Sequence, residues 1–245
     1  INMDDTTNGT ATDATAADLA ATITGTATFG STAALGSPTN TFGTIALNTS
    51  GSGTVGSTLM RADDITGTLA AGGTHTAITA SDDVTLTTTN ANALTIGTLT
   101  TGATVASSAS VTHTGSGALN INAVGASAGT LTVNASAGGA TKVVASALTG
   151  KATLTGGTGA DTLTGGSGAD SLTISTSDIE TVKGGAGIDE VILTDATGNT
   201  LELEGVETVT GSSGIDEVIL TDEFGASIEI SDVETVVGGL GADNL

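Results

Sequence analysis

The sequence has no cysteine, tryptophan or tyrosine, and its 245 residues include only three phenylalanines, one proline and four basic residues. Without cysteine the chain forms neither disulfides nor thiolate metal sites, so packing or bound ions must make it rigid. The scarcity of aromatic residues predicts a core of thin Val, Ile, Leu and Ala layers. No apolar run approaches the roughly 18 residues that a membrane span needs, so we expect no membrane insertion.

Acidic residues are abundant, with 26 Asp and Glu against 4 Lys and Arg, for a net charge of -22. Nucleic acids and anionic lipids bind through Lys and Arg, so we expect cations rather than polyanions as partners. The charge is unevenly distributed. Residues 1–155 hold eight Asp and three basic residues, a net of -5, whereas residues 156–245 hold nine Asp, nine Glu and one Lys, a net of -17. The two regions therefore differ in surface chemistry.

Short runs of alternating apolar and polar residues, such as VTLTTT, ALNINAV and TLTVNAS, recur from about residue 26 and are separated by Gly, Ser, Asn and Asp. This pattern predicts β-strands joined by turns. The expected inward side chains recur at short and regular intervals and are Leu94, Val105, Leu119, Leu131, Val143, Leu154, Leu163 and Leu172. Regular spacing of this kind predicts an all-β fold, a parallel β-helix or β-roll solenoid. Residues 13–22 are either one or two helical turns or a lead-in strand.

Two segments in the C-terminal third, KGGAGIDEVILTDATGNTLELEGVETVT and TGSSGIDEVILTDEFGASIEISDVETVV, align with a shift of 27 residues. Each copy contains three strand-like stretches, so we interpret one copy as one three-sided coil. Glu180, Glu207 and Glu234 fall in register, and we expect them on the solvated outer face because Val206 and Val233 beside the last two point inward.

A nine-residue motif carries the chemistry. GGTGADTLT (156–164) is followed directly by GGSGADSLT (165–173), and GGAGIDEVI, GSSGIDEVI and a truncated GGLGADNL follow later. Calcium takes six or more oxygens, which glycine turns and an aspartate can supply. Stacked coils also bring like charges within roughly 4.8 Å, where they repel by about 0.9 kcal/mol even in water. The alternative is that these Gly-Asp turns only join strands.

On these motifs, residues 156–245 resemble the calcium-binding RTX repeats, and the Thr/Ala/Ser-rich region before them is similar to bacterial S-layer proteins and large RTX adhesins. The resemblance implies Ca²⁺ as cofactor. It implies ligation by Asp161, Asp170, Asp189, Asp216 and Asp243, with backbone carbonyls of Gly156, Gly157, Gly159, Gly165, Gly166, Gly168, Gly184, Gly185 and Gly187.

Three regions follow: a lead-in segment (1–25), a Thr/Ala/Gly-rich solenoid (26–155) and an RTX-like solenoid (156–245). We expect an extracellular, type I secreted structural protein of the bacterial cell surface that self-associates into a lattice or filament. Its contacts would be coil ends and an apolar outer row at Ile192 and Ile219. The alternatives are an adhesin stalk or ice-binding module, or the secretion and folding module of a larger exoprotein. The sequence opens with INMDD and stops within a repeat, so we expect it to be part of a longer protein.

No motif indicates an enzyme. GSGTVG (51–56) and GASAG (125–129) match nucleotide-binding and hydrolase patterns, but neither is followed by the helix that those patterns require. His75 and His113 have no partner at metal-ligand spacing, so we expect both on the surface.

Overall fold

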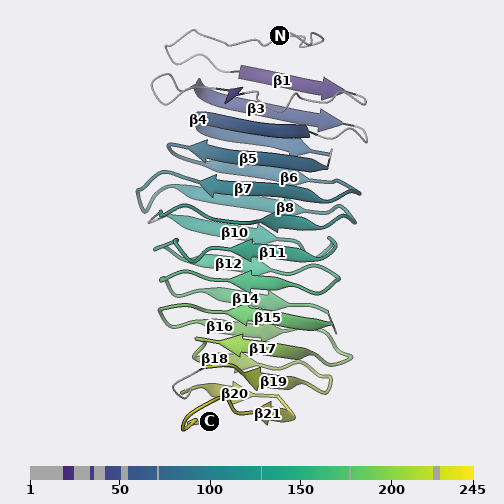
Figure 1. The fold of residues 1–245 in the computed structure, drawn as a ribbon, viewed down its shortest axis with the longest axis vertical. Coiled ribbons are helices and arrows are strands. Elements are labelled where there is room, and N and C mark those ends of the chain that lie inside the picture. The colour runs from purple at the N-terminus through teal and green to yellow at the C-terminus, as the bar shows by residue number, and fades with distance from the viewer. Residues whose placement is uncertain are drawn as a thin grey trace.

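The computed structural model describes residues 19–24, 34–35, 42–50, 55–70, 72–127, 129–176, 178–222 and 227–245. All its regular elements are strands of one parallel sheet, stacked along the long axis in Figure 1. They are β1 (Leu19–Thr24), β2 (Ala34–Leu35), β3 (Phe42–Ser50), β4 (Val55–Leu69), β5 (Gly73–Ala80), β6 (Val84–Thr88), β7 (Leu94–Thr100), β8 (Ser108–His113), β9 (Leu119–Ile121), β10 (Thr130–Asn134), β11 (Thr141–Val144), β12 (Ala152–Thr155), β13 (Thr162–Thr164), β14 (Ser171–Ile174), β15 (Ile179–Lys183), β16 (Glu190–Leu193), β17 (Thr200–Glu204), β18 (Thr208–Thr210), β19 (Glu217–Leu220), β20 (Glu229–Ser231) and β21 (Thr235–Val237).

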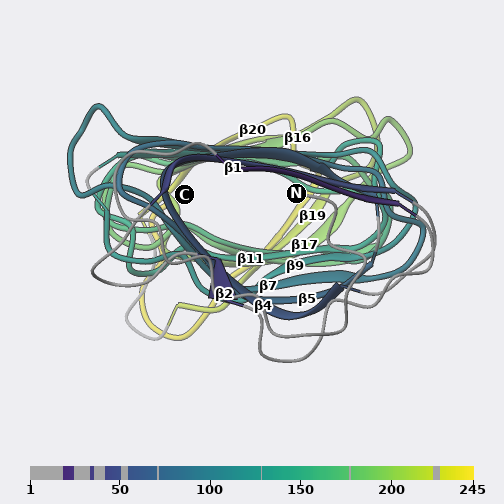
Figure 2. The same ribbon diagram turned by 90° about the horizontal axis from the view of Figure 1, so that it is seen from above.

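The chain winds as a two-sided solenoid, because from β5 onward each strand pairs with the second strand after it. From β5 onward, odd-numbered strands form one face, which we call the odd face, and even-numbered strands form the even face. Before β5, strands β1 and β3 lie on the even face, β2 lies on the odd face, and β4 runs from the odd face onto the even face. Figure 2, viewed along the stack, shows these two broad faces joined by turns at two edges. The predicted all-β parallel solenoid is therefore confirmed.

The prediction of one three-sided coil per repeat was wrong. Coils in this region are shorter than the repeat, since Thr200 already pairs with Glu217, and Thr208 with Glu229. Each repeat does supply three strands, but a coil uses only two, so one repeat makes one and a half coils. The equivalent strands β16 and β19 consequently lie on opposite faces, and their residues Ile192 and Ile219 do not form a single apolar row.

The core is a stack of inward-facing Val, Ile, Leu and Ala side chains from both faces. The predicted inward residues are buried, with one exception: Val105 is 81% exposed. It lies in the turn between β7 and β8, outside the strand alternation that directs the other side chains inward. A core of thin aliphatic layers is therefore confirmed.

Both histidines are buried, contrary to the prediction. His113 Nε2 donates to the Gly117 carbonyl at 2.8 Å, and its Nδ1 accepts from the Thr88 hydroxyl at 2.7 Å, so this ring is a hydrogen-bonded part of the core. Burial lowers the pKa of His75 to about 4, which keeps that ring neutral at pH 7.

At the N-terminal end, the segment 13–22 lies partly outside the described residues, and residues 19–22 belong to strand β1. In the part of the chain that the structure describes, no helix is long and apolar enough to cross a membrane.

Candidate calcium-binding turns

Five turns share one geometry, in which an aspartate carboxylate lies against the glycine five residues before it. A carbon atom built onto Gly156 as a side chain would lie 2.0 Å from Asp161 Oδ2, so any larger residue there would displace the Asp161 carboxylate. The same contact joins Gly165 to Asp170, Gly184 to Asp189, Gly211 to Asp216 and Gly238 to Asp243. The predicted motif therefore forms one recurring turn.

These turns are divided between the two edges of the solenoid. The first edge holds the turns that lead from even-numbered to odd-numbered strands, including 156–161 and 211–216. The second edge holds the turns that lead from odd-numbered to even-numbered strands, including 165–170 and 184–189. The tandem nonapeptides thus serve opposite edges, and Asp161 and Asp170 do not share one site.

Turns 165–170 and 184–189 stack directly on each other at the second edge. The Ala186 amide donates to the Gly166 carbonyl at 3.0 Å. Gly185 and Gly187 adopt φ of 114° and 134°, and a side-chain carbon on either would lie within about 2.2 Å of a carbonyl oxygen of the turn above. Positive φ and close backbone approach together explain why glycine occupies both positions.

Four of the five turn carboxylates also accept a hydrogen bond from the coil before them. The donors are backbone amides, so these bonds link successive coils as strand pairing does. The bonds are Thr141 N to Asp161 Oδ1 (2.7 Å), Ala152 N to Asp170 Oδ1 (2.6 Å), Asp170 N to Asp189 Oδ1 (2.8 Å) and Asn199 N to Asp216 Oδ1 (2.8 Å).

Residues 147–173 match the family model of the RTX calcium-binding nonapeptide repeat, which describes four copies. The match covers the tandem motifs and the two turns that they build. The chain carries RTX calcium-binding repeats. Calcium is therefore the ion of these repeats. No curated protein and no solved structure matches the chain. The turn 184–189 lies beyond the matched residues yet has the geometry of the matched turns, so the RTX architecture continues past residue 173.

The RTX carboxylates occupy positions that belong to the core in earlier coils. Asp170 lies beside Ala152, which pairs with Leu131. Asp161 lies beside Thr141, which pairs with Leu119. The inward row therefore changes from apolar to acidic where the RTX repeats begin.

Burial leaves two of these carboxylates incompletely satisfied. Asp161 and Asp189 are 2% and 1% exposed, and Oδ2 of each has no hydrogen-bond partner among the described residues. Burial raises the pKa of both to about 6, and the charge of Asp178 near Asp161, and those of Asp170 and Glu207 near Asp189, act in the same direction. Buried oxygens that lack donors fit a hard cation such as Ca²⁺, which takes oxygen ligands.

The prediction that Glu180 faces solvent was wrong. Its side chain is fully buried, and its Oε2 accepts the Asp161 amide, while Oε1 has no hydrogen-bond partner among the described residues. Burial raises its pKa to about 7, and the charges of Asp161 and Asp178 add to that rise. Glu207 and Glu234 accept the amides of Asp189 and Asp216 in the same way, although Glu207 is half-buried and Glu234 is exposed.

Asp216 differs from the other RTX aspartates because protein donors satisfy it. It accepts from the backbone and side-chain nitrogens of Asn199 and from the amide and hydroxyl of Ser212. Burial opposes ionisation, but these hydrogen bonds outweigh it and lower the pKa of Asp216. Ser212, which interrupts the glycine motif, thus supplies hydrogen-bond donors to Asp216.

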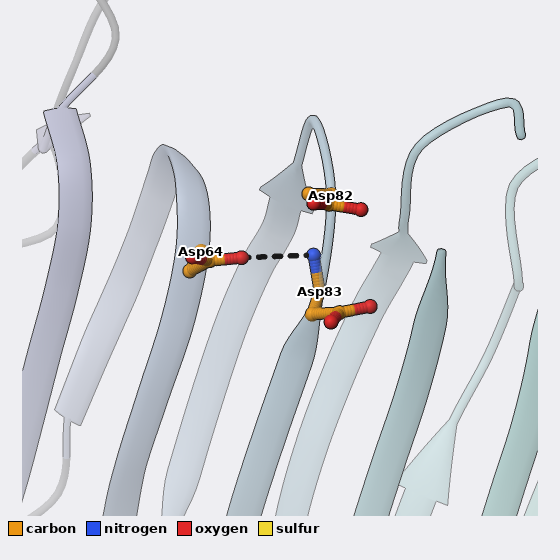
Figure 3. Close-up of side chains that lie close together, drawn as sticks. All are labelled: Asp64, Asp82 and Asp83. Atoms are coloured by element: carbon orange, nitrogen blue, oxygen red, sulfur yellow. Dashed lines mark hydrogen bonds between the residues drawn. The ribbon is translucent and has the colours of Figure 1, made fainter. Parts of the chain in front are cut away.

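A second acidic cluster lies on the second edge, higher in the stack. Oxygens of Asp64, Asp82 and Asp83 all lie within 4.8 Å of one another (Figure 3). The Asp83 amide donates to Asp64 Oδ1 at 3.2 Å, and the Ser108 amide donates to Asp83 Oδ1 at 2.6 Å. These carboxylates are exposed or half-buried, so water screens their repulsion, unlike that of the RTX turns.

Proposed function

We propose that this chain is a structural module of the bacterial cell surface, exported without calcium and folded by calcium outside the cell. The observation that supports this most directly is the set of buried carboxylate oxygens without donors at both edges. The calcium concentrations that fill extracellular modules, about 0.1 to 1 mM, are far above cytosolic levels. Metal binding then supplies folding free energy only after export.

The ion would be held by Asp161 at the first edge and by Asp170 and Asp189 at the second, with glycine carbonyls of the same turns. Asp243 repeats the turn geometry near the C-terminal end and is assigned the same role. Calcium would neutralise carboxylates that otherwise repel one another across stacked coils. The region that depends on calcium is 156–245, whereas apolar packing would hold the coils before it.

Hydrogen exchange with and without a chelator tests this function region by region. Chelation is expected to remove protection at Leu163, Leu172 and Val191 and to leave the coils before residue 150 protected. The double variant Asp161→Asn, Asp170→Asn should need more calcium to fold, whereas Asp82→Asn, Asp83→Asn, a matched change in the exposed cluster, should not. Equal protection with and without chelator would contradict the proposal.

We further propose that the module self-associates through its C-terminal coil. Among the residues that the structure describes, strands β20 and β21 each pair with one neighbouring strand, and Val237, Leu240 and Leu245 are 44%, 72% and 63% exposed. Unpaired strand edges beside exposed apolar side chains favour contact with a second copy. Light scattering in millimolar calcium should show assemblies that the variant Val237→Lys, Leu240→Lys lacks; monomeric wild-type protein at high concentration would contradict this.

A second candidate function rests on the even face. Two rows of short polar side chains run along it in consecutive coils. One row is Thr66, Thr85, Ser110, Thr132, Thr153 and Ser171, and the other is Thr68, Thr87, Thr112, Asn134, Thr155 and Thr173. All are exposed or half-buried, and neither row contains a charge before Glu190.

The geometry of these rows suits ice. Neighbouring strands lie about 4.8 Å apart and alternate residues about 6.7 Å apart, so the rows form a rectangular lattice of hydroxyl groups that approximates water positions on an ice face. On the odd face, Lys142, Val144 and Lys183 interrupt the equivalent rows. The expected activity is inhibition of ice recrystallisation, abolished by Thr112→Lys and retained by Asn120→Lys on the opposite face. Binding to crystalline polysaccharide without any effect on ice would reject this candidate.

A further inference from the structure

An aspartate of an RTX-type turn meets a glutamate of the next coil at three places. The backbone amide of the aspartate donates to Oε2 of the glutamate, and the two residues are 18 or 19 positions apart. The pairs are Asp161 with Glu180, Asp189 with Glu207 and Asp216 with Glu234. One pair spans the second edge and two span the first, so the arrangement follows the coil and not one side of the molecule.

Each glutamate lies within one residue of the start of a strand (β15, β18 or β21), and the turns before these strands lack the nonapeptide glycine pattern. The residues before Glu180 are Ser-Thr-Ser-Asp-Ile, and those before Glu207 are Glu-Gly-Val. Such turns do not form the glycine cradle that aims carbonyls at an ion. In these coils, the glutamate carboxylate at the start of the strand can supply the oxygen ligands for an ion held by the RTX turn that stacks on it.

The Asp161 and Glu180 pair contains more oxygens than donors. Asp161 Oδ2 and Glu180 Oε1 are buried and have no hydrogen-bond partner among the described residues. The nearest basic residue in sequence, Lys183, pairs instead with Glu204 at the surface. Two buried acidic groups in contact need a cation or a proton, because leaving either ionised and unpaired is costly.

We infer that Glu180 is a calcium ligand, which completes with Asp161 a site shared by an RTX turn and a turn without the nonapeptide pattern, and that Glu207 does the same with Asp189 at the opposite edge. This inference rests on the proposed calcium function and adds ligands outside the nonapeptide. Glu234 serves as a comparison within the same chain. The carboxylate of its partner Asp216 already accepts hydrogen bonds from Asn199 and Ser212, so by this inference Glu234 binds no ion.

Counting bound calcium on the full chain tests the inference. Equilibrium dialysis with radioactive calcium gives the number of ions and their midpoints for the wild type, Glu180→Gln, Glu207→Gln and Glu234→Gln. Glutamine retains an oxygen that accepts the aspartate amide but lacks the charge. We expect Glu180→Gln and Glu207→Gln each to lose one ion or to raise one midpoint at least tenfold, and Glu234→Gln and the exposed control Glu202→Gln to match the wild type.

The outcomes separate the inference from the proposed function. Wild-type calcium binding with unchanged ion number and midpoints in Glu180→Gln and Glu207→Gln would overturn the inference and leave the proposed function standing. A wild-type chain that binds no calcium would overturn both. If Glu180→Gln fails to fold in calcium by circular dichroism, Glu180→Asp, which keeps the charge but shortens the side chain, replaces it. A raised midpoint then supports ligation, and a wild-type midpoint refutes it.

Discussion

Replacing the buried Asp161 and Glu180 pair with Asn and Gln should change stability in opposite directions with and without calcium. In the calcium-free protein, burial raises the pKa of Asp161 from 3.8 to about 6 and that of Glu180 from 4.5 to about 7. The folded protein then holds these protons more tightly than the unfolded chain does. The pair therefore favours folding below about pH 4, and this contribution is lost as pH rises toward 7.

The magnitude follows from about 1.4 kcal/mol for each pKa unit. The two shifts together amount to on the order of 6 kcal/mol, which screening by nearby solvent reduces to on the order of 4 kcal/mol. That is a large part of the total stability of a typical domain, which is on the order of 10 kcal/mol. Without calcium, the double variant should therefore be more stable than the wild type at pH 8 and similar to it only below about pH 4.

Urea unfolding followed by far-ultraviolet circular dichroism measures this, since the chain has no tryptophan or tyrosine to report by fluorescence. Comparing variant with wild type cancels the contribution of His75, whose lowered pKa makes stability rise with pH up to about 6.5. With millimolar calcium at pH 8 the order should reverse, because only the wild type has both charges to offer the ion. A wild type more stable than the variant in calcium-free buffer at pH 8 would refute the reasoning.

Three further changes test the architecture. Gly187→Ala forces a side chain onto φ of 134° beside a carbonyl, at a cost on the order of 1 to 3 kcal/mol, and should raise the calcium midpoint for folding. Leu119→Ala should cost about 2 to 5 kcal/mol in urea unfolding because Leu119 is fully buried. Val105→Ala should change the unfolding free energy by less than about 0.5 kcal/mol because Val105 is 81% exposed, and a large loss there would mean that its turn packs in solution.

The alternation of apolar and polar residues was sufficient to predict the strands and most of the core, because a β-strand directs every second side chain inward in any fold. It does not determine how many strands close a coil. Three strands in one repeat fit a three-sided coil as well as one and a half two-sided coils. The pairing of Thr200 with Glu217 distinguishes the two, and that information lies in contacts between coils.

The turn aspartates were located from the motif, but their grouping was not, since adjacent nonapeptides serve opposite edges. The predictions for Glu180 and for both histidines were wrong although the sequence held the signal. Counted in steps of two from the buried Val182, Glu180 points inward, and counted from Val111, His113 does too. Apolar character alone does not identify an inward residue, because here alternation places polar groups inside and hydrogen bonds or ions must satisfy them.

Because each 27-residue repeat makes one and a half coils, the number of repeats determines which face the later strands occupy. Gaining or losing one repeat would turn every later strand over to the opposite face and move every later Gly-Asp turn to the other edge. Gaining or losing two repeats would restore both. Duplication in even numbers is therefore the change in length that preserves which side of the solenoid faces a partner.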